Sequence, residues 1–208
     1  MRPFWKRKPP PTDLREIIEH FDEAAQDEEN FPSTIDPRIY HVQLLIEYFG
    51  DLNGRSALDA GSGKGRFSRV LKEQFPQASL TAFDLSAAML HFVPEGIERC
   101  QGSLTSLPFQ TAAFDCAFAI ESLEHAVDVE SAVADLCRVV KAGGQVVVID
   151  KNADHWGRLK TPAWEKWFDR KAMEKLLGRH CQEVSSRPIS YWEDVAPDGL
   201  FFAWLARK

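Results

Sequence analysis

The chain has 208 residues, of which 44% are hydrophobic and 27% are charged, and its formal net charge is −6. This length and composition are typical of one globular domain and exclude both wholesale disorder and two full domains. The acidic balance argues against general nucleic-acid binding, which needs a basic footprint. No apolar run reaches the roughly eighteen residues that a membrane-spanning helix requires.

Residues 1–11 predict a disordered basic tail that ends in a proline run and lacks the apolar core of a signal peptide. Because the tail holds Phe4 and Trp5, weak contact with an anionic surface is one interpretation. We favour the other, a solvated tail. The four cysteines form no C-x-x-C pair, and three lie within apolar runs. They predict reduced thiols and a cytoplasmic protein without disulfides.

Two helices are expected before the first strand, and we assign residues 12–50 to them. The first begins at Thr12, a candidate N-cap, and the second covers roughly 37–49. Further along, short apolar runs alternate with helical patterns. The runs predict strands at 56–60, 79–83, 97–101, 114–120 and 145–150. The helical patterns lie at 64–75, 86–92 and 128–140.

The helix at 128–140 is well marked, because Asp128 can cap its start and Gly143 can end it. Alternating strands and helices predict a doubly wound, Rossmann-like α/β fold, with a mainly parallel sheet and helices on both faces. After a helix at 169–180, two apolar stretches flank the turn "APDG" and predict an antiparallel C-terminal hairpin. Residues 12–208 are therefore expected to form a single domain.

The stretch "SALDAGSGKGRF", residues 56–67, turns from the first strand into a helix through three glycines. Such a loop can hold a ligand at the carboxyl end of the sheet, or it can be a tight turn and nothing more. Its spacing is G-x-G-x-G, with Arg66 where a dinucleotide fingerprint has a third glycine. Asp59 would repel a pyrophosphate and favour a cation. A ligand with a positive end and no phosphates fits better than a nicotinamide dinucleotide.

The second predicted strand ends at Asp84, and an acid there can accept both hydroxyls of a ribose. The alternative is that Asp84 caps the next helix, although Ser86 could cap it instead. With these features the chain resembles the class I S-adenosylmethionine-dependent methyltransferases, in the small-molecule type that carries an "LEH" motif. The stretches that carry the resemblance are "LDAGSGKG" (58–65), "FDLS" (83–86), "GSLTSLPF" (102–109), "FDCAFAIESLEHAVD" (114–128) and "RVVKAGG" (138–144).

The resemblance implies S-adenosylmethionine as cofactor and assigns its contacts. Asp59, Gly61 and Gly63 would border the methionine part, with Ala60 among the binding residues beside them. Asp84 would hold the ribose, and Leu85 would pack on the adenine. Ser103 and Leu104 would lie along the adenine edge, and Glu121 would face the cofactor. The family often has an acid where this chain has Ser103, and a neutral acceptor is typically weaker than a charged one.

The expected reaction is methyl transfer to an acceptor that we expect to be a small molecule, with nitrogen, oxygen and carbon all open. His125 is the candidate base, with Glu121 beside the cofactor; the alternative for His125 is a capping or packing role. Residues 151–168 are rich in aromatic side chains and could cap the substrate pocket. We expect Trp156 and Trp164 to line it, together with Tyr40, or else the aromatic side chains pack into the core.

We expect no metal, because the remaining histidines form no ligand pattern. A monomer and a dimer both remain open. Three other functions are alternatives. A dehydrogenase conflicts with the glycine spacing, and a non-catalytic binding module of this fold would bind the cofactor without turnover. A methyltransferase for protein or RNA is the third, and the acidic charge weakens its RNA version.

Overall fold

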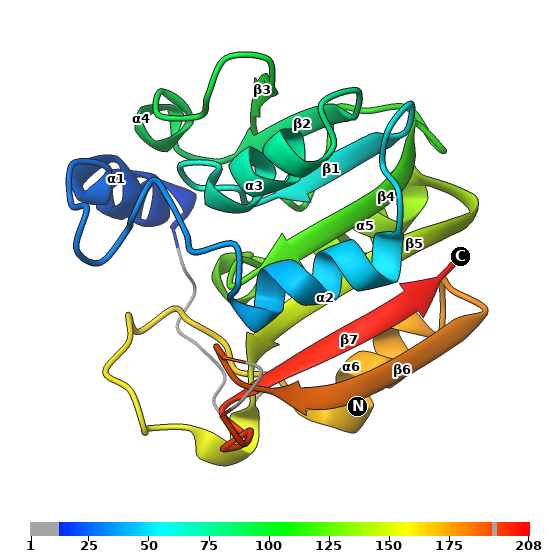
Figure 1. Cartoon of the computed structure of the whole chain (residues 1–208). Helices are drawn as coiled ribbons and strands as arrows, with labels where there is room; N and C mark the ends of the chain where they lie inside the picture. The colour runs from blue at the N-terminus through cyan, green and yellow to red at the C-terminus, as the bar shows by residue number, and fades with distance from the viewer. Residues whose placement is uncertain (1–12, 193–194) are drawn as a thin grey trace.

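The computed structural model describes residues 13–192 and 195–208. Seven strands form one sheet in the order β3-β2-β1-β4-β5-β7-β6, with helices on both faces (Figure 1). The strands are β1 (Ser56–Ala60), β2 (Ser79–Asp84), β3 (Glu98–Gln101), β4 (Phe114–Ile120), β5 (Val140–Lys151), β6 (Glu183–Ile189) and β7 (Phe201–Arg207). The helices are α1 (Leu14–Ala24), α2 (Tyr40–Phe49), α3 (Arg66–Gln74), α4 (Ala87–Leu90), η1 (Leu123–His125), α5 (Val129–Val139), η2 (Ala153–His155) and α6 (Arg170–Leu177).

The sheet is parallel except for one strand. β1 pairs in parallel with β2 and β4, and the flanking strands β3 and β5 continue the parallel pattern. β7 lies antiparallel between β5 and β6. The predicted fold class and the C-terminal hairpin are therefore confirmed. The strand order reverses between β1 and β4, and in such sheets ligands bind beyond the carboxyl ends of the strands at this point.

Two apolar cores, one on each face of the sheet, fill the space between the sheet and its helices. On one face, α2 and α3 contribute buried side chains such as Leu45 and Leu71 to a core that includes Phe118 of β4. On the other face, α5 and α6 contribute Leu136 and Leu177. Figure 1 shows α2 and α3 in front of the strands and α5 and α6 behind them. The middle strands are buried on both faces, which explains their continuous apolar sequences.

The residues expected to start one helix and to end another are not those found, and several other helices are shorter at an end than predicted by one to three residues. Thr12 lies outside the described residues, and the N-cap of α1 is Asp13, whose carboxylate accepts a hydrogen bond from Arg15 N at 3.0 Å. Asp128 caps α5 as predicted. Gly143, however, does not end this helix, because α5 ends at Val139 and the chain continues directly into β5. Gly143 adopts φ 76° within that strand, where the pairing with β4 is irregular.

The remaining sequence predictions have mixed outcomes. Residues 1–11, the predicted tail, lie outside the described residues. All four cysteines are free thiols, and Cys116, Cys137 and Cys181 are buried. None of the helices in the described part of the chain combines the length and the apolar character needed to span a membrane.

Candidate functional site

A cavity of about 330 Å³ lies at the carboxyl ends of β1, β2 and β4. One part of its wall is formed by the glycine loop after β1, the end of β2 and the turn after β4. The other part is formed by α1, the segment that follows it, and residues 160–165. The volume lies within the range of pockets that hold a cofactor or a drug-sized ligand.

The glycine loop is fixed by main-chain hydrogen bonds. Gly61 N and Ser62 N both donate to Phe83 O of the neighbouring strand, at 2.7 and 3.0 Å. Gly61 has φ 79°, and a Cβ on it would lie 2.3 Å from Ser122 Cβ. Only glycine fits this position, because any side chain would both strain the backbone and collide with the turn after β4. Gly61 and Gly63 line the cavity.

Asp59 and Ala60 support the loop and do not line the cavity. Both are buried, and the Asp59 carboxylate accepts a hydrogen bond from Ser68 Oγ of α3 at 2.7 Å. Burial raises the pKa of Asp59 to about 7, and the nearby Asp84 charge adds to the increase. Asp59 is therefore a buried support of the glycine loop, which it joins to α3 through Ser68.

Asp84 faces the cavity from the end of β2. Its two oxygens accept hydrogen bonds from Gly63 N at 2.7 Å and Ser86 N at 2.9 Å. Ser86 is the N-cap of α4, where its Oγ accepts from Met89 N. The capping role therefore belongs to Ser86, and each Asp84 oxygen keeps a lone pair for a further donor.

Leu85, Ser103 and Leu104 complete this part of the wall. Ser103 Oγ lies 2.9 Å from Thr105 Oγ1, so the hydroxyl already has one partner on its own loop. The structure brings these three side chains to the same cavity as the glycine loop and Asp84, although they lie on different connections between strands.

Glu121 follows β4 and lines the cavity with an unusual backbone, since its φ is 50°. Non-glycine residues in this region are strained by about 1–3 kcal/mol and cluster at functional sites. Its Oε1 accepts from Tyr191 Oη at 3.0 Å and lies 3.4 Å from Arg66 NH2. Sequence reasoning missed the roles of both partners, because Tyr191 sits in a predicted strand and Arg66 was noted only for not being glycine.

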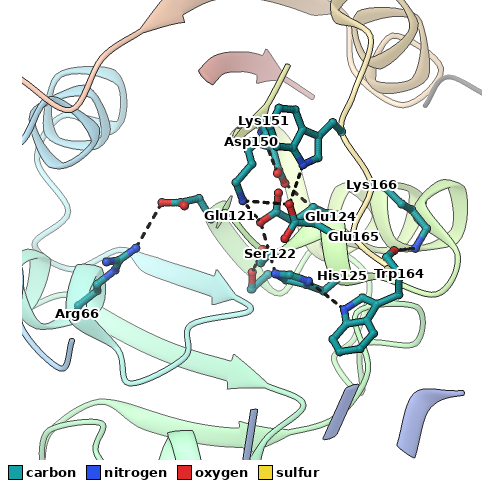
Figure 2. Close-up of polar contacts among 12 residues, drawn as sticks. Arg66, Glu121, Ser122, Glu124, His125, Asp150, Lys151, Trp164, Glu165 and Lys166 are labelled. Atoms are coloured by element: carbon teal, nitrogen blue, oxygen red, sulfur yellow. Dashed lines mark hydrogen bonds and ion pairs between the residues drawn. The ribbon is translucent and has the colours of Figure 1, made fainter. Parts of the chain in front are cut away.

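His125 lies at the end of η1 and lines the same cavity (Figure 2). Its Nε2 is 3.4 Å from Glu124 Oε1, and its Nδ1 is 3.3 Å from the indole nitrogen of Trp164. Glu124 is buried and bound by the Lys151 ammonium, whose Nζ is 2.5 Å from Glu124 Oε1. The same ammonium lies 3.4 Å from Glu165 Oε1.

The Glu124, His125 and Glu165 side chains have the donor atoms of a metal site within 4.8 Å of one another. The Lys151 ammonium lies against both carboxylates of this group, 2.5 Å from Glu124 Oε1 and 3.4 Å from Glu165 Oε1. The chain thus supplies its own positive charge there. The expectation that the protein uses no metal remains a prediction.

The aromatic residues of 151–168 divide into two sets. Trp167 and Phe168 are fully buried in the core, as the packing alternative predicts. Trp164 is also buried and contacts His125, although it is not part of the cavity lining. Trp156 packs edge-on against Trp167, with ring centroids 5.5 Å apart, and does not line the cavity.

Tyr40 does not line the cavity either, because the N-terminal wall is α1 and not α2. Tyr40 begins α2, its N donates to Tyr191 O at 2.8 Å, and its ring lies below the Arg187 guanidinium. The wall instead contains His20, Phe21 and Phe31. The His20 ring is 5.3 Å from that of Trp164, and the Phe21 ring is 5.0 Å from that of His125.

The segment after α1 is held on the glycine loop by Lys64. This lysine is buried, and its Nζ lies 2.6 Å from Glu28 Oε1 and 3.3 Å from Asp27 O. Asp22 of α1 also accepts a hydrogen bond from Ser86 Oγ at 2.5 Å. The N-terminal wall is therefore attached to the loops that form the opposite wall.

Comparisons with known proteins agree with this geometry. A family model described as a methyltransferase domain matches residues 58–148. The ubiquinone/menaquinone biosynthesis C-methyltransferase UbiE of Legionella pneumophila (strain Paris) is 26% identical over 174 residues, covering 78% of this chain and 69% of that protein. The malonyl-[acyl-carrier protein] O-methyltransferase of Pseudescherichia vulneris is 28% identical over 188 residues, covering 86% and 68%.

The fold matches that of solved structures as well. The geranyl diphosphate C-methyltransferase from Streptomyces coelicolor A3(2), in complex with Mg²⁺, geranyl diphosphate and S-adenosyl-L-homocysteine, superposes with a TM-score of 0.67. The match covers 96% of this chain and 99% of that chain at 14% identity, so this likeness concerns the fold alone. The matched family model and these relatives support a class I S-adenosylmethionine-dependent methyltransferase family for this chain. It is a methyltransferase enzyme.

Proposed function

We propose that the enzyme methylates a small molecule, which it holds between α1, the "LEH" turn and residues 160–165. The observation that carries the proposal is that His125 and Glu121 line the same cavity as the glycine loop and Asp84. The names of the two relatives point to different acceptors, a quinone precursor and an acyl carrier. The apolar wall that contains Phe21 and Phe31 supports an acceptor with an apolar body.

We propose that the cofactor is S-adenosylmethionine and that one part of the cavity wall holds it. Gly61 and Gly63 would border its methionine part, and the free lone pairs of Asp84 would accept the ribose hydroxyls. Leu85, Ser103 and Leu104 would surround the adenine. The cradle fits such a group, because a Cβ on Gly63 would meet no atom within 4 Å. Asp59 and Ala60 would act from below by holding the loop.

When bound, the cofactor supplies a methyl group on a sulfonium sulfur. The chain then aligns the acceptor and excludes water. Glu121 places a negative charge, held by Tyr191 and Arg66, at the end of β4 where a sulfonium is favoured. His125 takes the proton that the acceptor atom loses as its bond to the methyl carbon forms.

Residues 12–208 are proposed to work as one domain, in which 12–50 contain the N-terminal helices and 151–168 cap the substrate pocket. The free, buried thiols support a reducing, cytoplasmic location. The oligomeric state is proposed to be a monomer or a dimer. The alternative of weak contact between the basic tail and an anionic surface concerns residues 1–11, which lie outside the described part of the chain.

The proposal is tested with methyl-labelled cofactor and a cell extract, followed by mass spectrometry of the small-molecule and macromolecular fractions. Labelling of a small molecule that is lost in His125→Ala supports the proposal. Labelling of protein or RNA alone would overturn the acceptor class. Titration calorimetry with S-adenosyl-L-homocysteine runs beside it, since cofactor binding without turnover over a broad acceptor panel would favour the non-catalytic alternative.

A further inference from the structure

Both ring nitrogens of His125 have partners. Figure 2 shows the ring between the Trp164 indole on one side and the Glu124 carboxylate on the other. Nδ1 is 3.3 Å from Trp164 Nε1, and Nε2 is 3.4 Å from Glu124 Oε1. A base needs a lone pair that can reach its substrate, so these two contacts decide which nitrogen can act.

The donor and acceptor chemistry of the partners selects one tautomer. An indole N–H can only donate a hydrogen bond, so Nδ1 of His125 must offer its lone pair to Trp164. The ring hydrogen is then on Nε2, which faces the Glu124 carboxylate, an acceptor. The lone pair that would take a proton from an acceptor molecule is therefore the one that the indole covers.

Glu124 is held in its ionised form by the groups around it. Burial alone would raise its pKa, but the hydrogen bond from His125 and the charge of Lys151 lower the pKa to about 2. Burial and the Glu124 carboxylate raise the pKa of Asp150 well above its usual range. Glu124 Oε2 is buried and has no hydrogen-bond donor among the described residues. A permanent acceptor thus faces Nε2.

Trp164 is held at Nδ1 by its own segment. Lys166 is buried, and its Nζ donates to Trp164 O at 3.2 Å and to Ala126 O at 2.8 Å. Lys166 N also donates to Glu124 O at 3.0 Å. The main chain around Trp164 is therefore joined to η1, while its ring is bounded by the His20 ring of α1. The main chain is thus fixed, so an acceptor molecule that reaches Nδ1 has to displace the indole side chain.

We propose that Trp164 and Glu124 are positioning residues that hold His125 as its Nε2–H tautomer, with Nδ1 as the proton-accepting atom and the Trp164 indole as its resting partner. The acceptor molecule must replace the indole at Nδ1, which it can do without loss only if it brings an O–H or N–H donor of its own. The proposal rests on the function proposed above. It narrows the substrate to acceptors whose nucleophilic atom is an oxygen or a nitrogen that carries a proton.

In the reaction this geometry implies, the bond from sulfur to the methyl carbon breaks as a bond from the acceptor oxygen or nitrogen to that carbon forms. The electron pair of the broken bond stays on sulfur, which becomes a neutral thioether. The acceptor's proton moves to His125 Nδ1, and the resulting imidazolium is stabilised by Glu124 through Nε2–H. No further reactant is needed.

The tautomer is tested on the full-length protein, without any acceptor, by long-range ¹H–¹⁵N correlation spectra of the histidine side chains. The His125 signals are assigned by their loss in His125→Gln. We expect a pyridine-type Nδ1 and a pyrrole-type Nε2. A pyrrole-type Nδ1 overturns the proposal, and it does so whether or not methyl transfer is found, so this failure is separate from failure of the proposed function.

The indole contact is tested with two matched substitutions. Trp164→Phe keeps a ring but removes the donor, so the Nδ1 signal should shift toward that of a pyridine-type nitrogen without a hydrogen bond. Trp156→Phe removes an indole from the same segment that packs on Trp167 and not on His125, and should leave both His125 signals in place. Equal shifts in the two variants, or none in either, overturn the role of Trp164.

An acceptor found in the labelling experiment supplies a kinetic test. Trp164→Phe should lower its KM about fivefold, the size expected for one uncharged hydrogen bond that no longer has to be replaced. A purely structural role for Trp164 predicts no such decrease. An efficient acceptor that reacts at carbon, or at an oxygen or nitrogen without a proton, would overturn the substrate class.

Discussion

The two parts of the cavity wall are built from different kinds of contact. The part that we propose to hold the cofactor, here called the cofactor wall, is formed by the glycine loop, Asp84 and the 103–104 loop. It is held mainly by backbone donors, because Gly61 N, Ser62 N and Gly63 N all donate within it. The part that we propose to hold the acceptor molecule, here called the acceptor wall, is formed by α1, the "LEH" turn and residues 160–165. It is held by side chains, through the Lys151 ion pairs and the ring contacts around His125. A substitution in the first wall therefore acts on the chain path itself. A substitution in the second can change binding and leave the sheet intact.

Gly61→Ala should have the largest effect, because it combines a positive φ with a collision against Ser122. We expect a loss of about 3 kcal/mol or more in the free energy of unfolding, measured by urea denaturation. Gly63→Ala is the matched control, since Gly63 has φ 52° but no atom within 4 Å of its Cβ position. It should lose only about 1 kcal/mol. Equal losses would mean that Ser122 moves aside and that the loop is not fixed by this contact.

Asp59→Asn should stabilise the protein without cofactor at high pH. The pKa of folded Asp59 is raised to about 7, so the unfolded chain loses this proton at lower pH than the folded protein does. The free energy of unfolding therefore falls as pH rises from about 4 to about 7. An asparagine can still accept the hydrogen bond from Ser68 Oγ and has no charge to bury.

We expect a gain of about 2 kcal/mol in unfolding free energy at pH 8 and almost none at pH 4. Urea denaturation at both pH values measures it. A gain of equal size at the two pH values would contradict the assignment, because the effect would not then come from ionisation. The ionised Asp59 carboxylate below the glycine loop would thus lower the free energy of unfolding of the protein without cofactor.

Trp164→Ala tests the acceptor wall. It should lower turnover at least tenfold, about 1.4 kcal/mol in the barrier, because it removes the indole surface beside His125. Cofactor affinity should change less than about threefold, since the polar and ring contacts of Trp164 among the described residues lie outside the glycine loop and are with His125, Lys166 and His20. Trp156→Ala is the comparison: it should cost stability through Trp167 and leave turnover within about threefold. If Trp164→Ala lost cofactor affinity and kept turnover, the two walls would be assigned the wrong way round.

The same contrast explains what the sequence could predict. The strands, the glycine loop and Asp84 were predictable because their signals are local: a short apolar run, a glycine at a fixed spacing, an acid at a strand end. The prediction that Gly143 ends the preceding helix was wrong, because a glycine after a helix is compatible with both a helix end and an irregular strand. The capping of α4 by Ser86 was one of two open alternatives, and only the atomic contacts decide between them.

The acceptor wall could be predicted only in part. His125 and Trp164 were candidates, but the partners that define their state lie far along the chain. Trp164 is 39 residues from His125, Lys151 is 27 from Glu124, and Tyr191 is 70 from Glu121. Such pairs have no periodic or spacing signal in one sequence. Tyr40 was expected in this wall because the sequence does not say which of two amphipathic N-terminal helices faces the ligand.

Ser103 is the cofactor-wall position where the sequence departs from the family's usual acid. Its side chain lines the cavity, and its hydroxyl is already paired with Thr105 Oγ1 at 2.9 Å. A hydroxyl engaged in this way has less to offer to an adenine amino group. Asp84 lies on the same wall but is engaged by two backbone N–H groups, which reduces its repulsion of a second carboxylate.

Ser103→Asp should therefore tighten cofactor binding by roughly 1 kcal/mol, about fivefold in Kd, by exchanging a neutral acceptor for a charged one. Desolvation of the new carboxylate opposes the gain, which is why this effect is the smallest of the four. Titration calorimetry with S-adenosyl-L-homocysteine measures it, and Thr105→Val serves as the control, since it frees the Ser103 hydroxyl without adding charge. A clear loss of affinity in Ser103→Asp, with an unchanged circular dichroism spectrum, would mean that the adenine edge does not lie at Ser103.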